Sequence, residues 1–139
     1  MKDAMNLAAR IVSHPVAADA DTVYDFAHRV ENLPQWAAGL TTRLVVEDGQ
    51  WFSETPQGRI RIAMAPHNAY RVMDHDVTLP GGLTVHNAFR VTPTGDGSLL
   101  SFVVLRLPEA TDEEFERDCG LVAADLRTLA TLVEGVPAK

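Results

Sequence analysis

The middle of the chain, residues 41–107, alternates apolar and polar side chains over six short runs. They read TTRLVVED, QWFSET, RIRIAMA, AYRVMDHDVTL, LTVHNAFRVT and SLLSFVVLRL. Alternation with a period of two residues is typical of strands that bury one face. The runs are separated by DG, PQG, PHN, PGG and TGDG, which are turn signals. Short connections between successive strands predict an antiparallel meander.

The segment before the meander changes period. RIVSHPV, residues 10–16, reads as a strand whose proline favours an edge position or an irregular end. ADADTVYDFAHRV then predicts a short helix capped by Asp19 or Asp21. ENLPQWAAGL predicts a second short helix, with Asn32 as its N-cap and Gly39 at its end.

A long helix is predicted after the meander. Thr111 and Glu114 form a T-x-x-E capping box, and Gly135 suits the helix end. One apolar stripe then follows at alternating steps of three and four residues, consisting of Phe115, Cys119, Val122, Leu126, Leu129 and Val133. Such a stripe is usually core. A helix of about 23 residues is roughly 34 Å long, so it can cross a whole curved sheet.

This order, β-α-α-β6-α, resembles the helix-grip fold of the START/polyketide cyclase-like superfamily (SRPBCC), which includes Bet v 1-like plant proteins. The resemblance is carried by ADADTVYDFAHRVENLPQWAAGL, residues 18–40, by the hairpins, and by DEEFERDCGLVAADLRTLATLVEG, residues 112–135. It covers nearly the whole chain. It implies an α+β fold in which a strongly curved antiparallel sheet of about seven strands wraps around the C-terminal helix.

The resemblance also implies an apolar cavity between sheet and helix. Members of the superfamily bind lipids, steroids, polyketides or plant hormones. Some cyclise or dehydrate polyketides, and others act as chaperone co-activators. The motifs quoted above are packing motifs, so they point to a fold and leave these activities open.

The hairpin VMDHDVTLPGGLTVHN, residues 72–87, tests which side chains face such a cavity. Hydrophobic matching favours pairing Leu79 with Leu83 across the Pro-Gly-Gly turn, because a one-residue slip would mix the two faces. This register directs His75 and Asn87 inward as a cross-strand pair. The next hairpin, matched in the same way, pairs Phe89 with Phe102.

Two polar side chains on an otherwise apolar inner face need hydrogen-bond partners. Either His75 and Asn87 satisfy each other, or a ligand or water completes them. A neutral imidazole beside a cavity can also act as a general base, so His75 and Asn87 are the candidate catalytic pair. The candidate ligand-binding residues are Trp36, Met73, His75, Val85, Asn87, Phe89, Phe102, Arg106, Phe115, Cys119 and Val122.

Other polar groups favour ordinary explanations. Asp74 and Asp76 are predicted on the solvent face, with Asp76 opposite His86, where exposed ion pairs contribute little. This register separates His75 from His86, so no metal site is expected there. Cys119 reads as a small core hydrophobe. His14, His28 and His67 are expected in solvent.

Composition narrows the classes of function further. At 139 residues the chain is expected to be one domain, residues 1–139. A formal charge of −7 disfavours nucleic acid and anionic membranes as partners. A single cysteine excludes an internal disulfide, and no signal peptide or membrane span is evident, so a cytoplasmic location is expected. No phosphate loop, dinucleotide fingerprint or nucleophile triad appears, so no cofactor is expected.

The last strand-like run is apolar on both faces. Its outward residues Leu99, Val103 and Leu105 either weaken the face assignment or mark a contact surface of a homodimer. The preferred hypothesis is binding of a small hydrophobic or aromatic molecule between sheet and helix. The alternatives are a polyketide cyclase or dehydratase-like enzyme that uses His75, and an interaction module similar to the chaperone co-activators.

Overall fold

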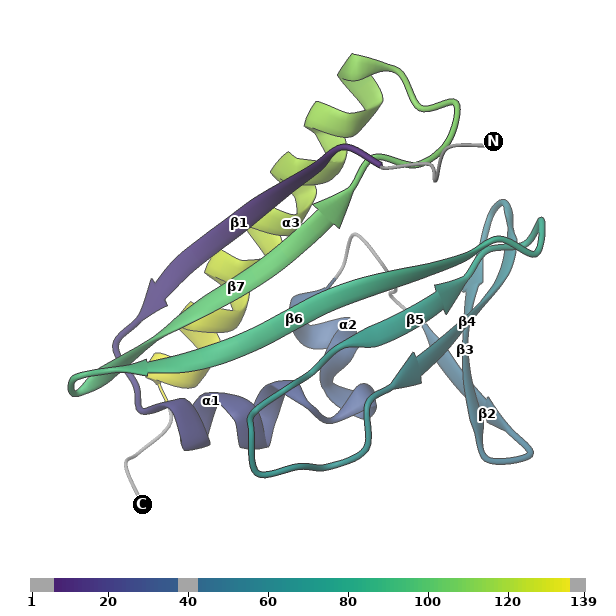
Figure 1. Ribbon diagram of the computed structural model, residues 1–139. Coiled ribbons are helices and arrows are strands. Elements are labelled where there is room, and N and C mark those ends of the chain that lie inside the picture. The colour runs from purple at the N-terminus through teal and green to yellow at the C-terminus, as the bar shows by residue number, and fades with distance from the viewer. Residues whose placement is uncertain (1–6, 38–42, 136–139) are drawn as a thin grey trace, which may run out of the picture.

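The computed structural model describes residues 7–37 and 43–135, and Figure 1 traces the chain through them. Two short helices and a 3₁₀ turn follow the first strand, six strands come next, and a long helix ends the chain. The elements are β1 (Ala9–Val16), α1 (Ala20–Ala27), η1 (Val30–Asn32), α2 (Leu33–Trp36), β2 (Leu44–Glu47), β3 (Gln50–Thr55), β4 (Gly58–Met64), β5 (His75–Thr78), β6 (Thr84–Thr94), β7 (Gly97–Leu105) and α3 (Asp112–Glu134).

All seven strands form one antiparallel sheet in the order β1-β7-β6-β5-β4-β3-β2. The meander is therefore confirmed, and β1 returns to pair with the last strand. In Figure 1, α3 runs along β1 and β7, while α1 and α2 lie near the lower part of the sheet. The helix packs one face against β1, β7, α1 and α2, and its opposite face is exposed.

The two predicted helix starts with side-chain caps are confirmed. Asp19 accepts a hydrogen bond from the backbone N–H of Thr22 at the start of α1. At the start of α3, the capping box between Thr111 and Glu114 closes in both directions. None of the described helices is long and apolar enough to cross a membrane.

Asn32 occupies the N-cap position of α2, as predicted, but its side chain makes no capping hydrogen bond there. Its side-chain amide donates to the carbonyl of Phe26, 3.0 Å away, and caps no N–H of α2. The helix is a single turn that follows directly on a 3₁₀ turn, so the chain needs no separate helix start there. The predicted helix end at Gly39 lies outside the described residues.

The register predicted from hydrophobic matching is confirmed in both central hairpins. His75 lies opposite Asn87 and Val77 opposite Val85 in the β5–β6 ladder. Phe89 lies opposite Phe102 in the β6–β7 ladder. The inward-facing residues of β7 are buried, whereas the outward Leu99 and Val103 are only partly buried, so the face assignment of the last strand holds for these residues. Leu105, also predicted outward, lies at the strand end and lines a pocket on the inner side.

The strand predicted over residues 69–79 is shorter than expected. Only His75–Thr78 forms β5, and Val72 makes an isolated bridge to Arg90. The Asn68 side chain takes up backbone N–H groups that would otherwise pair with a neighbouring strand, because its carbonyl oxygen accepts from the N–H groups of Tyr70 and Val72. A chain held by this local turn cannot continue as a regular strand.

The core lies between the sheet and the helices. Five of the six residues of the predicted α3 stripe are buried, and the sixth, Val122, is partly buried against them. The stripe is therefore core, as its spacing predicts. On the outer face of the sheet, Ile11 lies opposite Val103 and is 70% exposed, which leaves an apolar strip along β1 and β7.

Candidate functional site

A pocket of about 230 Å³ lies between the inner face of the sheet and helices α2 and α3. Most of its wall is apolar and comes from β5, β6, β7, α2, α3 and the segment after β7. Among the described residues of the wall, the polar side chains are His75, Asn87, Asp118 and Asp125. An apolar pocket with a few convergent polar groups is the usual form of a small-molecule site.

His75 is the most deeply buried of these polar groups, with 4% of its surface exposed. Its Nδ1 lies 3.0 Å from the backbone carbonyl of Met73. A carbonyl oxygen only accepts hydrogen bonds, so the contact requires the proton on Nδ1. The Nε2 atom of the neutral ring then carries a lone pair, and no described residue donates to it.

The surroundings keep the His75 ring neutral. Burial lowers the pKa of His75 below its ordinary value, and the hydrogen bond to Met73 opposes this only partly. The rings of Phe89 and Phe102 approach the imidazole at centroid distances of 6.4 and 5.8 Å. His75 therefore offers the pocket a hydrogen-bond acceptor without a charge.

Asn87 lies opposite His75, but the two side chains do not satisfy each other. The imidazole bonds within its own strand, to Met73, and no described residue bonds the Asn87 amide. Of the two alternatives left open by the sequence, the structure favours a ligand or water that completes them. Asn87 adds one donor group and one acceptor group to the same wall.

The pocket wall also contains two carboxylates of α3 that the sequence analysis did not identify. Asp118 and Asp125 are half-buried and lie seven positions apart, so they share one helix face. Burial raises the pKa of Asp118 above its ordinary value. The sequence signal that could have identified them is their position beside the apolar stripe, because each directly precedes a stripe residue, Cys119 or Leu126.

Four more of the predicted ligand-binding residues lie in the pocket wall, namely Trp36, Val85, Phe102 and Val122. Trp36 is buried, and its indole Nε1 is a fully buried N–H that has no hydrogen-bond partner among the described residues. An unpaired buried donor costs about 1–3 kcal/mol, so this group stays available to an acceptor that can reach it.

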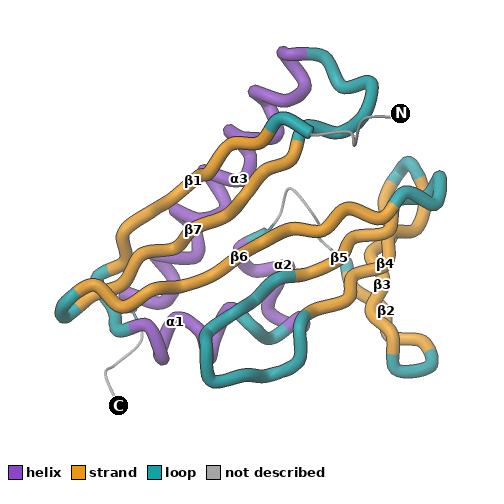
Figure 2. The backbone as a smooth tube through the Cα atoms, viewed as in Figure 1, coloured by secondary structure: helices purple, strands orange, loops and turns teal. Residues whose placement is uncertain are grey.

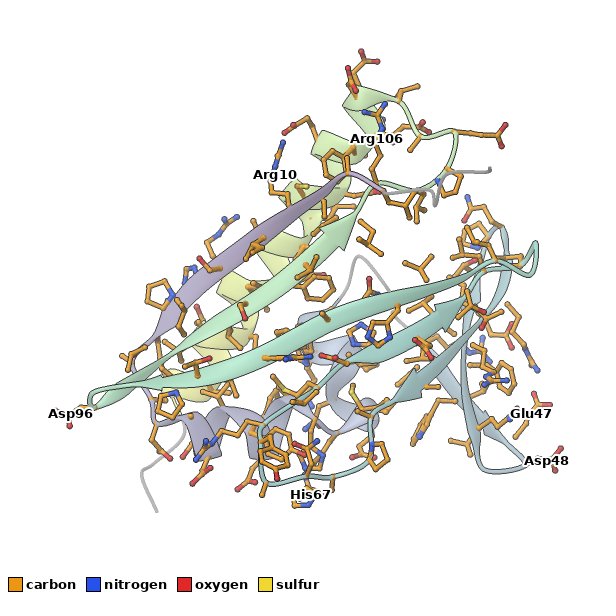
Figure 3. The ribbon with its side chains drawn as sticks, in the orientation of Figure 1. Arg10, Glu47, Asp48, His67, Asp96 and Arg106 are labelled. Carbon is orange, nitrogen blue, oxygen red and sulfur yellow. The ribbon has the colours of Figure 1, made fainter. Side chains whose placement is uncertain are left out.

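The remaining predicted residues lie outside the pocket wall. Met73 and Phe89 are fully buried in the core, and Phe115 and Cys119 are nearly so. Burial raises the pKa of the Cys119 thiol, which suits an inert core residue. Arg106 donates to the carbonyl of Ala110 and pairs with Asp112 at 2.6 Å, so it holds the start of α3, where Figure 3 labels it.

In the hairpin of residues 72–87, Asp74 and Asp76 face the other side of the sheet, as predicted. His86 Nδ1 lies 2.7 Å from Asp76, and His86 Nε2 lies 3.5 Å from Asp74. Asp74 also accepts hydrogen bonds from the Phe89 N–H and from Arg90. The acid–His–acid triplet around His75 therefore does not form a unit.

Comparison with known proteins gives similarity in structure alone. No family model and no curated protein sequence matches the chain. XoxI from Bacillus cereus superposes with a TM-score of 0.73 at 15% identity, over 93% of this chain and 97% of its own. The Aha1 dimer from Colwellia psychrerythraea gives 0.71 at 12% identity, over 93% and 98%. DynU16, a protein of the dynemicin biosynthetic locus, gives 0.68 at 14% identity, over 91% and 47%.

Identities this low establish the fold and leave the activity open. The curved seven-stranded antiparallel sheet and the long C-terminal helix α3 match the architecture of these neighbours. The chain therefore has the helix-grip fold that its element order predicts.

Proposed function

We propose that this protein binds a small, mainly apolar molecule in the pocket between the sheet and α3. The observation that carries the proposal is His75 Nε2, a neutral acceptor without a partner among the described residues, in a wall of apolar side chains. The volume of about 230 Å³ lies below the roughly 300–1,000 Å³ of typical ligand pockets. A ligand of one or two rings therefore suits it.

The charges of the pocket narrow the ligand class further. Neither lysine nor arginine is among the described residues that line it, whereas Asp118 and Asp125 are. A carboxylate ligand would meet the Asp118 carboxylate in a site of reduced dielectric, where no lysine or arginine of the described wall residues could balance the two charges. A neutral or cationic ligand that donates a hydrogen bond to His75 fits the wall better than an organic acid.

Calorimetric titration with three matched naphthalene compounds tests this proposal. 2-Naphthalenemethanol and 2-naphthylmethylamine are expected to bind, and 2-naphthoate is expected to bind at least about tenfold more weakly, a difference of about 1.4 kcal/mol. Absence of binding by all three would refute the ligand-binding proposal. Equal binding of the acid would refute only the charge preference.

A matched pair of variants tests whether the ligand binds in the pocket. Val85→Phe adds a ring to the pocket wall, whereas Val103→Phe adds the same ring on the outer face of the neighbouring part of the sheet. We expect Val85→Phe to weaken binding of the alcohol at least about tenfold and Val103→Phe to leave it unchanged. Equal effects of the two changes would place the bound probe elsewhere.

An enzymatic role is the second candidate, because the lone pair on His75 Nε2 could accept a proton from a substrate. His75→Gln separates the two roles. A binding protein keeps most of its affinity, since glutamine also offers an acceptor, whereas an enzyme of the polyketide cyclase or dehydratase kind loses turnover. The third alternative, an interaction module, requires a small, filled cavity and an exposed apolar patch. The strip at Ile11 meets the second requirement, whereas the open volume beside His75 does not meet the first.

A further inference from the structure

A second group of polar side chains lies away from the pocket, where the end of α1 meets the loop between β4 and β5. It consists of Asp25, His28 and His67, whose ligand-capable atoms all lie within 4.8 Å of one another. Figure 2 shows this loop beside α1, and Figure 3 labels His67 on it. The proposed small-molecule function does not involve these residues.

Helix geometry brings the first two together. Asp25 lies in the last turn of α1 and His28 is its C-terminal capping residue, still in helical conformation. Residues three apart on a helix share one face, so the carboxylate and the imidazole point the same way. No described residue bonds the Asp25 carboxylate, whose neighbour Arg29 donates to the Asp25 backbone carbonyl instead.

The loop delivers the second imidazole and is held in place by its own bonds. The Tyr24 hydroxyl accepts from the backbone N–H of Asn68, next to His67, at 2.9 Å. The Asn68 amide donates to the carbonyls of Pro66 and Val72 at 2.9 Å each. His67 therefore reaches the end of α1 from a fixed position in the loop.

Aromatic contacts orient the two imidazoles. The ring of Tyr24 stacks on His28 at a centroid distance of 4.7 Å, and the two imidazole rings meet edge to face at 5.0 Å. Two protonated imidazoles this close would repel each other.

We propose that Asp25, His28 and His67 form a binding site for a divalent transition-metal ion of the zinc class. Two imidazole nitrogens and one carboxylate are a ligand set typical of such ions, whereas Mg²⁺ and Ca²⁺ require mainly oxygen ligands. Tetrahedral zinc with bonds of about 2.1 Å places its ligand atoms about 3.4 Å apart. The three ligand-capable atoms lie up to 4.8 Å apart and would have to close to that spacing when the ion binds.

Bound metal would tie the β4–β5 loop to α1. The loop is attached to α1 by the Tyr24 hydroxyl and by an ion pair between Arg71 and Asp21. A metal ion would add a link between His67 and the helix end. A ligand that binds only the native state raises the melting temperature, so the added link is measurable as thermal stabilisation.

Calorimetric titration of the full untagged chain with zinc chloride, after removal of metal by a chelator, tests the proposal. We expect saturable binding of one zinc ion per chain and an increase in melting temperature, and no binding of magnesium under the same conditions. His67→Ala and Asp25→Asn are each expected to weaken zinc binding by more than about 10–100-fold, because even an outer-shell change costs that much.

Two further variants separate the site from folding effects and from other histidines. His28→Phe keeps an aromatic ring against Tyr24 and removes the ligand atom, so it should fold and lose zinc. His86→Ala is the matched control, since His86 also lies beside two carboxylates but has no second imidazole. Zinc binding that survives His28→Phe and His67→Ala together, or that disappears in His86→Ala, would overturn the proposal.

Discussion

The β5–β6 hairpin carries two histidines in opposite environments. His75 is 4% exposed and bonds a backbone carbonyl, whereas the His86 side chain is 60% exposed and lies between two carboxylates. They occupy adjacent cross-strand pairs, His75 with Asn87 and His86 with Asp76. A shift of one residue along the strands thus separates an uncharged pocket group from a solvent-exposed ion pair.

The same alternation reverses their protonation behaviour. Burial lowers the pKa of His75, while the hydrogen bond that His86 donates to the Asp76 carboxylate raises the pKa of His86. The two aspartates that flank His75 in the sequence therefore act on His86, their neighbour in space. Sequence proximity alone would assign them to the wrong imidazole.

The largest loss of stability among the variants that test this difference is expected when a charge is placed at the buried position, His75. His75→Glu places a carboxylate in an apolar wall that already contains Asp118 and has no lysine or arginine among its described residues. We expect a loss of about 3–5 kcal/mol in the free energy of unfolding, measured by urea denaturation at neutral pH.

His86→Glu is the matched control, because it changes the net charge by the same amount. It sets a third acid beside Asp74 and Asp76, but in solvent, so its cost should stay below about 1 kcal/mol. Similar losses for both variants would mean that the two faces of the hairpin do not differ in polarity as described.

An intermediate effect is expected from the two aspartates. The Asp74 carboxylate is mostly buried and accepts a hydrogen bond of 2.9 Å from the Phe89 N–H. Asp74→Ala removes this acceptor and also the ion-pair partner of Arg90. Leaving that N–H without a partner should cost about 1–3 kcal/mol. Asp76→Ala removes only an exposed partner of His86 and should cost less than about 1 kcal/mol. Thermal or urea unfolding of both variants measures the difference, and a reversed order would contradict it.

Much of the fold follows from the sequence, because its signals are local or periodic. The T-x-x-E box at Thr111 and the stripe from Phe115 place α3, and the pairing of Leu79 with Leu83 sets the register that directs His75 inward. Hydrophobic matching suffices here because a slip of one residue would expose the core face.

The details of the site could not be read in the same way. The Met73 carbonyl that accepts from His75 lies just before β5, where the chain is outside the regular strand. Asp118 enters the pocket through the rotation of α3 about its axis, and His67 meets His28 through the folding of a loop. These placements depend on tertiary packing, which one sequence pattern does not encode.

The smallest effect, and the most direct comparison of the two histidines, is their titration. Below the ordinary histidine pKa of about 6.5, His75 is protonated in the unfolded chain but stays neutral in the native structure. The contribution of His75 to the free energy of unfolding therefore falls as pH decreases. His86 has the opposite sign: its contribution is fully present below that value and is lost as pH rises through its raised native pKa. Because His86 is largely exposed, its share should stay below about 1 kcal/mol.

The imidazole C–H resonances followed by NMR from pH 5 to pH 9 would resolve the two rings. We expect the midpoint of His86 above the ordinary value and that of His75 below it. Asp76→Asn should lower the His86 midpoint and leave His75 almost unchanged, because the largest influence on His86 is its hydrogen bond to Asp76, whereas that on His75 is burial. A His75 midpoint above that of His86 would mean that the buried ring is charged, and a neutral acceptor would then no longer describe the pocket.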